Sequence, residues 1–195
     1  IFIIKKIKPD FVFSTGGYVT LAPALASYIL SIPLFIHEQN SVPGLVNRIL
    51  NRLSKLTFEA YPDSFNKSSK IRTVGNPVRS GIIKNPATEA KKKEQFNILI
   101  LGGSQGSKQL NEIVLQSFKD KIIPSHWHVV HQIGALDNSS IVDAYSKQGF
   151  SYEVVPYIAN IGKAYHESDL VIGRSGAMTI SEICSSSKPS ILFPL

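Results

Sequence analysis

Short apolar runs alternate with segments of helical spacing through both halves of this chain of 195 residues. Residues 34–36, 96–101 and 170–172 are strand-like, and residues 107–118 repeat apolar side chains at helical intervals. Strands that alternate with helices are typical of parallel sheets with helical crossovers. We therefore predict an α/β fold with two doubly wound parallel sheets, in domains 1–79 and 96–195. Residues 80–95 are polar and rich in lysine, and they are interpreted as a linker.

The segment 169–182, with the sequence DLVIGRSGAMTISE, carries the strongest indication of a ligand site. It predicts a strand over 170–172, a tight turn over 173–176 and a helix from Ala177. Unpaired N–H groups at such a helix start suit an anion. Thr179 and Glu182 share a helix face, and their hydroxyl and carboxylate suit the hydroxyls of a sugar. The alternative is an ordinary strand-to-helix turn in which Glu182 is a solvated helix residue.

A glycine-rich loop, GGSQG at residues 102–106, follows the apolar run 96–101. Glycines permit close approach of the backbone, so such a loop can wrap a pyrophosphate. The sequence matches neither the dinucleotide fingerprint GxGxxG nor the GK[ST] of a P-loop. The alternative is a tight connection that binds nothing.

Two further predicted strands end in polar groups. The run 32–36 leads into His37-Glu38-Gln39-Asn40, and the run 71–74 leads into GNPVR at residues 75–79. In open α/β sheets, ligands gather outside the carboxyl ends of the strands. Four polar or glycine-rich strand ends together indicate a binding site more strongly than any one of them.

The charge balance is basic, with 21 Lys+Arg against 14 Asp+Glu. No zinc-finger, RNP or basic-arm pattern is present, so nucleic acid is not favoured as a partner. An anionic substrate or an anionic membrane surface accounts for the charge equally well. The one cysteine, Cys184, excludes an intrachain disulfide, and its small, apolar surroundings predict burial. No cluster of residues has metal-ligand spacing.

Residues 11–36 carry no charge and are numerous enough to span a bilayer. However, glycines at 16 and 17 and prolines at 23 and 33 interrupt the stretch, which predicts strand, glycine loop, buried helix and strand instead. Both ends of the chain are apolar, at residues 1–4 and 191–195. Such ends are unusual for a complete protein, and we expect a piece of a longer one.

In order and spacing, the motifs HEQNSVPGLVNR, TVGNPVR, LGGSQGSKQLN and GRSGAMTISEI resemble the MurG family of N-acetylglucosaminyltransferases. The stretch FSTGGYVTLAP resembles the second glycine loop of that family, and the resemblance covers about residues 8–195. It implies two Rossmann-like domains of the GT-B type, both incomplete here, with a nucleotide sugar in the cleft. It also implies a peripheral protein at the cytoplasmic face of the bacterial plasma membrane.

The activity implied by the resemblance is transfer of N-acetylglucosamine from UDP-N-acetylglucosamine to the lipid-linked muramoyl-pentapeptide called lipid I, which forms lipid II in peptidoglycan synthesis. No metal or other cofactor is expected. Two alternatives stay open. One is a glycolipid transferase of the same superfamily with another donor. The other is a nucleotide-sugar-binding subunit that needs a partner chain for catalysis.

The resemblance also assigns residues. Ser104 matches the residue that meets the diphosphate, Arg79 matches a donor-binding arginine, and Asn40 matches the residue that reaches the transferred sugar. Ile158 matches a backbone position beside the uracil, and Glu182 matches the ribose-binding carboxylate. From the residues alone, Arg79 could instead form a surface ion pair and Asn40 could cap a helix or turn. The remaining positions are the nucleoside run Ala177, Met178, Thr179, Ile180 and Ser181, the phosphate-loop glycines Gly102, Gly103 and Gly106, and the acceptor-side loop Gly16, Gly17 and Tyr18.

No catalytic base can be assigned. The family's candidate histidine lies on a glycine loop that would precede Ile1, and a Gln/Asn segment that touches the donor would follow Leu195, so we expect the isolated chain to be inactive. His37 is more readily interpreted as a structural histidine. Residues 45–56 predict a basic amphipathic helix that lies near anionic lipid or, alternatively, a domain helix with a solvated basic face. Tyr28 matches a membrane-facing position of the family.

Overall fold

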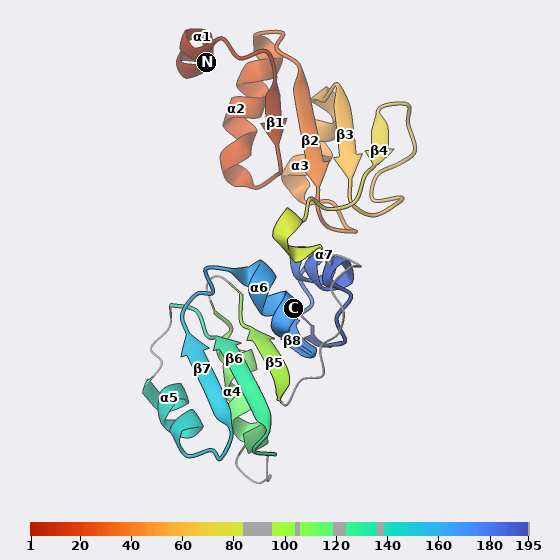
Figure 1. Ribbon diagram of the computed structural model, residues 1–195. Coiled ribbons are helices and arrows are strands. Elements are labelled where there is room, and N and C mark those ends of the chain that lie inside the picture. Colours follow the sequence, from red (N-terminus) through yellow and green to blue (C-terminus); the bar gives the residue numbers. More distant parts are fainter. Residues whose placement is uncertain (84–94, 104–105, 119–123, 136–138, 195) are drawn as a thin grey trace. The chain divides into compact units, whose positions relative to one another are not determined.

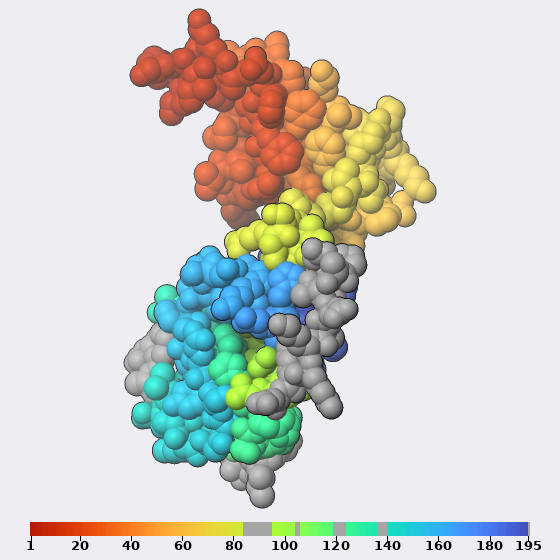
Figure 2. All heavy atoms as spheres, viewed as in Figure 1, coloured from red at the N-terminus to blue at the C-terminus, as the bar shows by residue number. Residues whose placement is uncertain are grey.

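The computed structural model describes residues 1–83, 95–103, 106–118, 124–135 and 139–194. The chain divides into two compact units, Ile1–Pro77 and Val78–Leu195. We call them unit 1 and unit 2; Figure 1 traces their elements and Figure 2 shows their surfaces. The boundary lies two residues before the predicted one, and most of the predicted linker is outside the described residues. Its start, 80–82, is a 3-10 turn (η1, Ser80–Ile82) in which Ile82 is fully buried, so this part belongs to unit 2.

Unit 1 is a parallel sheet of strands in the order β1-β2-β3-β4. Successive strands add in one direction, and right-handed crossovers then place the connecting helices on one face. That face is packed around Ala24, Leu34, Ile36, Val46 and Leu50. The elements are α1 (Phe2–Ile7), β1 (Val12–Ser14), α2 (Tyr18–Ile29), β2 (Leu34–Glu38), α3 (Leu45–Leu53), β3 (Leu56–Glu59) and β4 (Ile71–Thr73).

The opposite face of the unit 1 sheet carries a row of aromatic rings. Phe35 stacks on Phe58 with ring centroids 6.5 Å apart, and Phe13 lies 6.4 Å from Phe58. Phe13 is 52% exposed, whereas Leu34 and Ile36 on the helix side are buried. Alternation of side chains along each strand therefore separates an aliphatic face beneath the helices from an aromatic face.

Unit 2 is a parallel sheet in the order β7-β6-β5-β8-β9. Alternate residues of β5 enter two different cores. Ile98 and Ile100 pack with α4 and α5, whereas Leu99 packs with Tyr165 of α6 and Ile183 of α7. Both faces are covered, so the predicted doubly wound sheet is confirmed here. The elements are β5 (Phe96–Leu101), α4 (Lys108–Phe118), β6 (Trp127–Gln132), α5 (Ser139–Ser146), β7 (Ser151–Val155), α6 (Ile161–Glu167), β8 (Leu170–Arg174), α7 (Ala177–Ser186) and β9 (Ser190–Phe193).

The strand order of unit 2 reverses between β5 and β8, which are neighbours with Leu101 paired to Gly173. Strands β6 and β7 extend the sheet on one side of β5, and β8 and β9 extend it on the other. Connections leave such a switch point toward opposite faces, which opens a crevice at the carboxyl ends of the strands. The predicted glycine loop follows β5 and the predicted nucleoside helix follows β8, so both begin at the carboxyl ends of these neighbouring strands.

Three sequence expectations need correction. Gly173 and Arg174 continue β8 rather than forming the turn, because they pair with β9. Cys184 is exposed, since the neighbouring Ile183 occupies the side of α7 that faces the core. The helix over 18–29 is only partly buried. The interpretation of residues 11–36 as strand, loop, helix and strand is confirmed, and no helix in the described parts of the chain is long and apolar enough to cross a membrane.

Candidate functional site

The glycine loop after β5 has a shape that only glycine tolerates well. Gly103 and Gly106 have φ values of 85° and 79°, in the left-handed region. A Cβ added at Gly106 would lie 2.4 Å from the Ile133 carbonyl oxygen, so the backbone just after β6 fits directly against this glycine. Ser104, the predicted diphosphate contact, lies outside the described residues.

Gln132, at the carboxyl end of β6, joins this loop to the position predicted beside the uracil. It is 6% exposed, its Nε2 donates to the Gly103 carbonyl at 3.0 Å, and its Oε1 accepts from the Ile158 N–H at 3.3 Å. The Ile158 N–H is therefore engaged within the protein. Sequence reasoning missed Gln132, although a polar residue at the end of the strand beside β5 was the available signal.

Glu182 is half-buried on α7, and its Oε2 accepts a hydrogen bond from the Tyr165 hydroxyl at 3.2 Å. Burial raises the pKa of Glu182, while the Tyr165 hydrogen bond and the charge of Arg79 oppose that rise. Arg79 is thus an electrostatic neighbour of Glu182 within unit 2. Glu182 is therefore partly shielded from solvent and has a hydrogen-bond partner within the protein.

The other predicted residues of α7 line its first two turns. Gly176 is the N-cap, and its carbonyl oxygen accepts from the Ile180 N–H at 2.9 Å. The helix therefore supplies acceptors only for the N–H groups from Ile180 onward, and the N–H groups of the first turn are not used within the helix. Ser181 Oγ donates back to the Ala177 carbonyl at 2.8 Å. Ala177, Thr179, Ile180 and Ser181 are partly buried, and Met178 is 36% exposed. The helix therefore offers backbone donors at its start and Glu182 further along.

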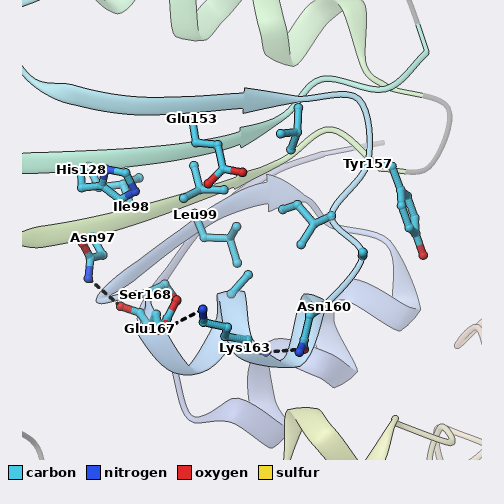
Figure 3. Close-up of a pocket in the computed structure, with 15 residues that line it drawn as sticks. Asn97, Ile98, Leu99, His128, Glu153, Tyr157, Asn160, Lys163, Glu167 and Ser168 are labelled. Atoms are coloured by element: carbon cyan, nitrogen blue, oxygen red, sulfur yellow. Dashed lines mark hydrogen bonds and ion pairs between the residues drawn. The ribbon is translucent and has the colours of Figure 1, made fainter.

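A cavity of about 620 Å³ lies between α6 and one face of β5, β6 and β7 (Figure 3). Ile158 lines it, but no other predicted donor residue does. Several polar groups that line it interact with one another. Lys163 Nζ forms an ion pair with Glu167 Oε1 at 3.6 Å, and the Lys163 backbone N–H donates to Asn160 Oδ1 at 3.0 Å. This cavity runs beside the predicted donor residues rather than among them.

In unit 1 the predicted acceptor loop and Asn40 line one cavity of about 200 Å³. Gly16 and Gly17 have φ values of 90° and 86°, and Tyr18 begins α2. A Cβ added at Gly16 would lie 2.9 Å from Asn47 Nδ2 of α3, whereas one at Gly17 would meet nothing within 4 Å. The structure therefore brings together Gly16, Gly17, Tyr18 and Asn40 as one site.

Glu38 organises that site, although sequence analysis assigned it no role. The residue is 2% exposed, and its carboxylate accepts hydrogen bonds from four donors. Oε1 accepts from the N–H and Nδ2 of Asn40, at 2.9 and 3.0 Å. Oε2 accepts from the Gly44 N–H at 3.0 Å and from Asn47 Nδ2 at 2.9 Å. The Asn40 side chain is thus fixed by Glu38, while the N-cap of α3 is Gly44.

The two polar strand ends of unit 1 meet as expected. His37 Nε2 lies 3.0 Å from the Gly75 carbonyl oxygen, and Asn76 Nδ2 donates to the Gln39 carbonyl at 3.1 Å. His37 is 5% exposed and hydrogen-bonded, which agrees with its interpretation as a structural histidine.

Helix α3 presents an apolar and basic surface. Val46 and Leu50 are buried, whereas Leu45 and Ile49 are 61% and 44% exposed. Arg48 and Arg52 are exposed on the same helix, and Lys55 is exposed just after its end. Tyr28 of α2 is also exposed, at 57%. Among the described residues there is no group of three or more His, Cys, Asp or Glu side chains that could hold a metal ion.

A doubly wound sheet with a glycine loop and a carboxylate-bearing helix at its switch point is an arrangement typical of nucleotide-binding α/β proteins. Residues 97–195 match the glycosyltransferase family 28 C-terminal domain, and residues 1–58 match the N-terminal domain of that family. The chain belongs to glycosyltransferase family 28.

Its relatives agree with the resemblance to MurG. It is 38% identical to a protein of Coxiella burnetii and 40% identical to one of Nitrosospira multiformis, in each case over 98% of this chain. Both are described as UDP-N-acetylglucosamine–N-acetylmuramyl-(pentapeptide) pyrophosphoryl-undecaprenol N-acetylglucosamine transferase. The chain spans about half of their length, 54% and 55%.

Solved structures support the same fold. MurG of Acinetobacter baumannii superposes with a TM-score of 0.75 at 34% identity, over 99% of this chain and 55% of that one. A UDP-GlcNAc 2-epimerase of Neisseria meningitidis gives a TM-score of 0.66 at 17% identity, over 97% of this chain and 60% of that one. The second similarity concerns the fold alone. The predicted GT-B-type α/β architecture is confirmed.

Proposed function

We propose that this chain is part of a transferase that moves N-acetylglucosamine from UDP-N-acetylglucosamine to lipid I, giving lipid II. The observation that carries the proposal is the 38–40% identity, over nearly the whole chain, to relatives described as that transferase. The glycine loop and Glu182 at the switch point of unit 2 support a nucleotide-sugar donor, and the cavity beside Asn40 in unit 1 supports a sugar or acceptor site.

In this proposal the acceptor hydroxyl attacks the anomeric carbon, the bond from that carbon to the diphosphate breaks, and UDP leaves. The negative charge that develops on the diphosphate meets backbone N–H groups of the glycine loop, the start of α7 and the cation of Arg79. Glu182 accepts from the ribose hydroxyls, and the backbone of Ile158 lies beside the uracil. Unit 1 holds the acceptor through the Gly16–Tyr18 loop and the transferred sugar through Asn40.

The test measures donor binding and transfer separately. Isothermal titration calorimetry of the 195-residue chain with UDP, UDP-N-acetylglucosamine and UDP-glucose examines the donor site. Transfer of labelled N-acetylglucosamine to lipid I is measured with the product of the longest reading frame that encodes this chain. Preference for another nucleotide sugar would favour another glycolipid transferase. Donor binding without transfer, relieved by a second polypeptide, would favour the binding-subunit alternative.

Replacing Glu182 by glutamine is expected to weaken UDP binding by at least about tenfold. A carboxylate accepts from two hydroxyls, whereas an amide accepts through one oxygen, and a hydrogen bond to a charged group contributes about 1.5–3 kcal/mol. Calorimetry with UDP and 2′-deoxy-UDP checks this: removal of the 2′-hydroxyl should cost the wild type more than the variant. Equal penalties in the two proteins would contradict the assignment. Glutamine is preferable to alanine, which would leave the Tyr165 hydroxyl without its acceptor.

We further propose that α3 contacts the anionic surface of the plasma membrane on its cytoplasmic side. The exposed Leu45 and Ile49 supply apolar contact, and the neighbouring basic groups supply attraction. Replacing both Arg52 and Lys55 by glutamine is expected to weaken binding to vesicles with anionic lipid by roughly thirtyfold at low salt, at about 1 kcal/mol per charge.

Vesicle co-sedimentation measures this effect, with purely zwitterionic vesicles as the lipid control. The matched protein control is Lys67→Gln together with Lys147→Gln, which removes the same charge from exposed positions outside α3. An equal loss in both double variants would mean that net charge, and not α3, determines the binding.

A further inference from the structure

We propose that Tyr165 is a positioning residue for the donor: its hydroxyl holds the Glu182 carboxylate as an ionised, fixed acceptor for the ribose diol. The inference rests on the proposed function, because it takes Glu182 as the ribose-binding group. It adds a residue from a different helix, which lies outside the motifs that resemble the MurG family.

The geometry joins two helices through one bond. Tyr165 lies on α6 and Glu182 on α7, and the phenol oxygen is 3.2 Å from Oε2. Tyr165 is fully buried and packs in the core with Leu99, Val171 and Ile183. A ring held in this way cannot change position cheaply, so its hydroxyl is a fixed point from which the carboxylate is oriented.

The bond uses one oxygen of Glu182 and leaves the carboxylate with acceptor capacity, since an ionised carboxylate has about four lone-pair sites. Two hydroxyls of a vicinal diol can then donate to the same group. A protonated Glu182 would carry a hydrogen on one oxygen and would lose part of that capacity. Recognition of the diol therefore requires that Glu182 stay ionised although it is half-buried.

The groups that face Glu182 act on its ionisation in opposite directions. Burial raises its pKa, whereas the hydrogen bond from Tyr165 and the positive charge of Arg79, which precedes η1, lower it. The pKa of Tyr165 itself is raised by burial and then by the charge and the hydrogen bond of Glu182, so the phenol stays a donor throughout the physiological range. As a donor, Tyr165 therefore favours the ionised form of Glu182 over the protonated form.

The variant Tyr165→Phe keeps the ring and removes the hydroxyl. The matched control is Tyr145→Phe, which deletes the hydroxyl of another fully buried tyrosine of unit 2, one that contacts His131 instead. A merely structural effect would be similar in both variants. Urea unfolding confirms that each variant is folded before binding is measured.

The first readout needs no ligand. Carbon-detected NMR follows the Glu182 carboxyl through a pH titration, with the signal assigned by its loss in Glu182→Gln. We expect Tyr165→Phe to raise the titration midpoint of Glu182 and Tyr145→Phe to leave it in place. An unchanged midpoint in Tyr165→Phe would overturn the proposal.

The second readout is calorimetric binding of UDP and 2′-deoxy-UDP between pH 5 and 8. Loss of a hydrogen bond to a charged group should weaken UDP binding about tenfold in Tyr165→Phe, and the acid limb of the affinity profile should move to higher pH. The penalty for the missing 2′-hydroxyl should shrink in this variant and persist in Tyr145→Phe. If Glu182→Gln weakens binding and Tyr165→Phe does not, the positioning role is wrong and the proposed function stands. If the wild type binds no UDP, the proposed function fails, and the NMR titration still decides whether Tyr165 holds Glu182 ionised.

Discussion

Replacing Gly106 by alanine is expected to lower the free energy of unfolding of unit 2 by at least about 3 kcal/mol. The residue has a φ of 79°, and a new Cβ would lie 2.4 Å from the backbone oxygen of Ile133. A left-handed conformation alone costs a residue with a side chain about 1–2 kcal/mol. The collision is with backbone, which cannot rotate aside, so the loop or the segment just after β6 must move.

Gly103→Ala is the matched control. Gly103 has a φ of 85°, but a Cβ there would meet nothing within 4 Å, so only the conformational cost of about 1–2 kcal/mol remains. The one tryptophan of the chain, Trp127 on β6, reports urea unfolding of unit 2 by fluorescence. An equal loss of unfolding free energy in the two variants would show that the contact with Ile133 does not contribute to the destabilisation.

Acid is expected to destabilise unit 2 through His131, by about 3 kcal/mol between pH 7 and pH 4. His131 is fully buried on β6, its Nδ1 lies 3.0 Å from the Tyr145 hydroxyl oxygen, and its Nε2 has no hydrogen-bond partner among the described residues. Burial lowers its pKa from 6.5 to about 4. The unfolded chain therefore takes up the proton first. Stability is complete above pH 6.5 and falls as the pH drops toward 4.

The measurement is urea unfolding at a series of pH values, again by Trp127 fluorescence. His131→Gln removes the titrating ring, so its free energy of unfolding should depend less steeply on pH between 7 and 4, whatever its absolute stability. His128→Gln is the control on the same strand, at a half-exposed position where the ring contacts Ser151. A wild-type slope that survives in His131→Gln would assign the acid sensitivity to other groups.

The regular elements of both units could be predicted from the sequence because their signals are local. The run Phe96–Leu101 is mostly apolar because both faces of β5 are buried from Ile98 to Leu101, and its predicted bounds match the strand. The helix over 107–118 was predicted within one residue. Errors arose where pairing with a distant strand determines the end of an element. The sequence around Gly173 and Arg174 is typical of a turn, but β9 pairs with both residues and extends the strand.

The partners within the candidate sites could not be predicted, because they depend on contacts between distant residues. Tyr165 reaches Glu182 from another helix, and Gln132 reaches Ile158 across 26 positions of the chain. No periodicity encodes either contact. The motif around Glu182 indicated which residue to examine, but only the packing of α6 against α7 shows what holds its carboxylate.

Glu38 has a mechanical consequence. Its two oxygens hold the backbone and side chain of Asn40 on one side and the start of α3, through Gly44 and Asn47, on the other. All four donors are neutral, and the Glu38 side chain is buried, so losing one of these hydrogen bonds would leave part of a buried carboxylate without a partner. The end of β2, the loop that follows it and the start of α3 are consequently linked through the Glu38 carboxylate. A displacement of α3 is therefore expected to shift Asn40 as well, because both are hydrogen-bonded to this one side chain.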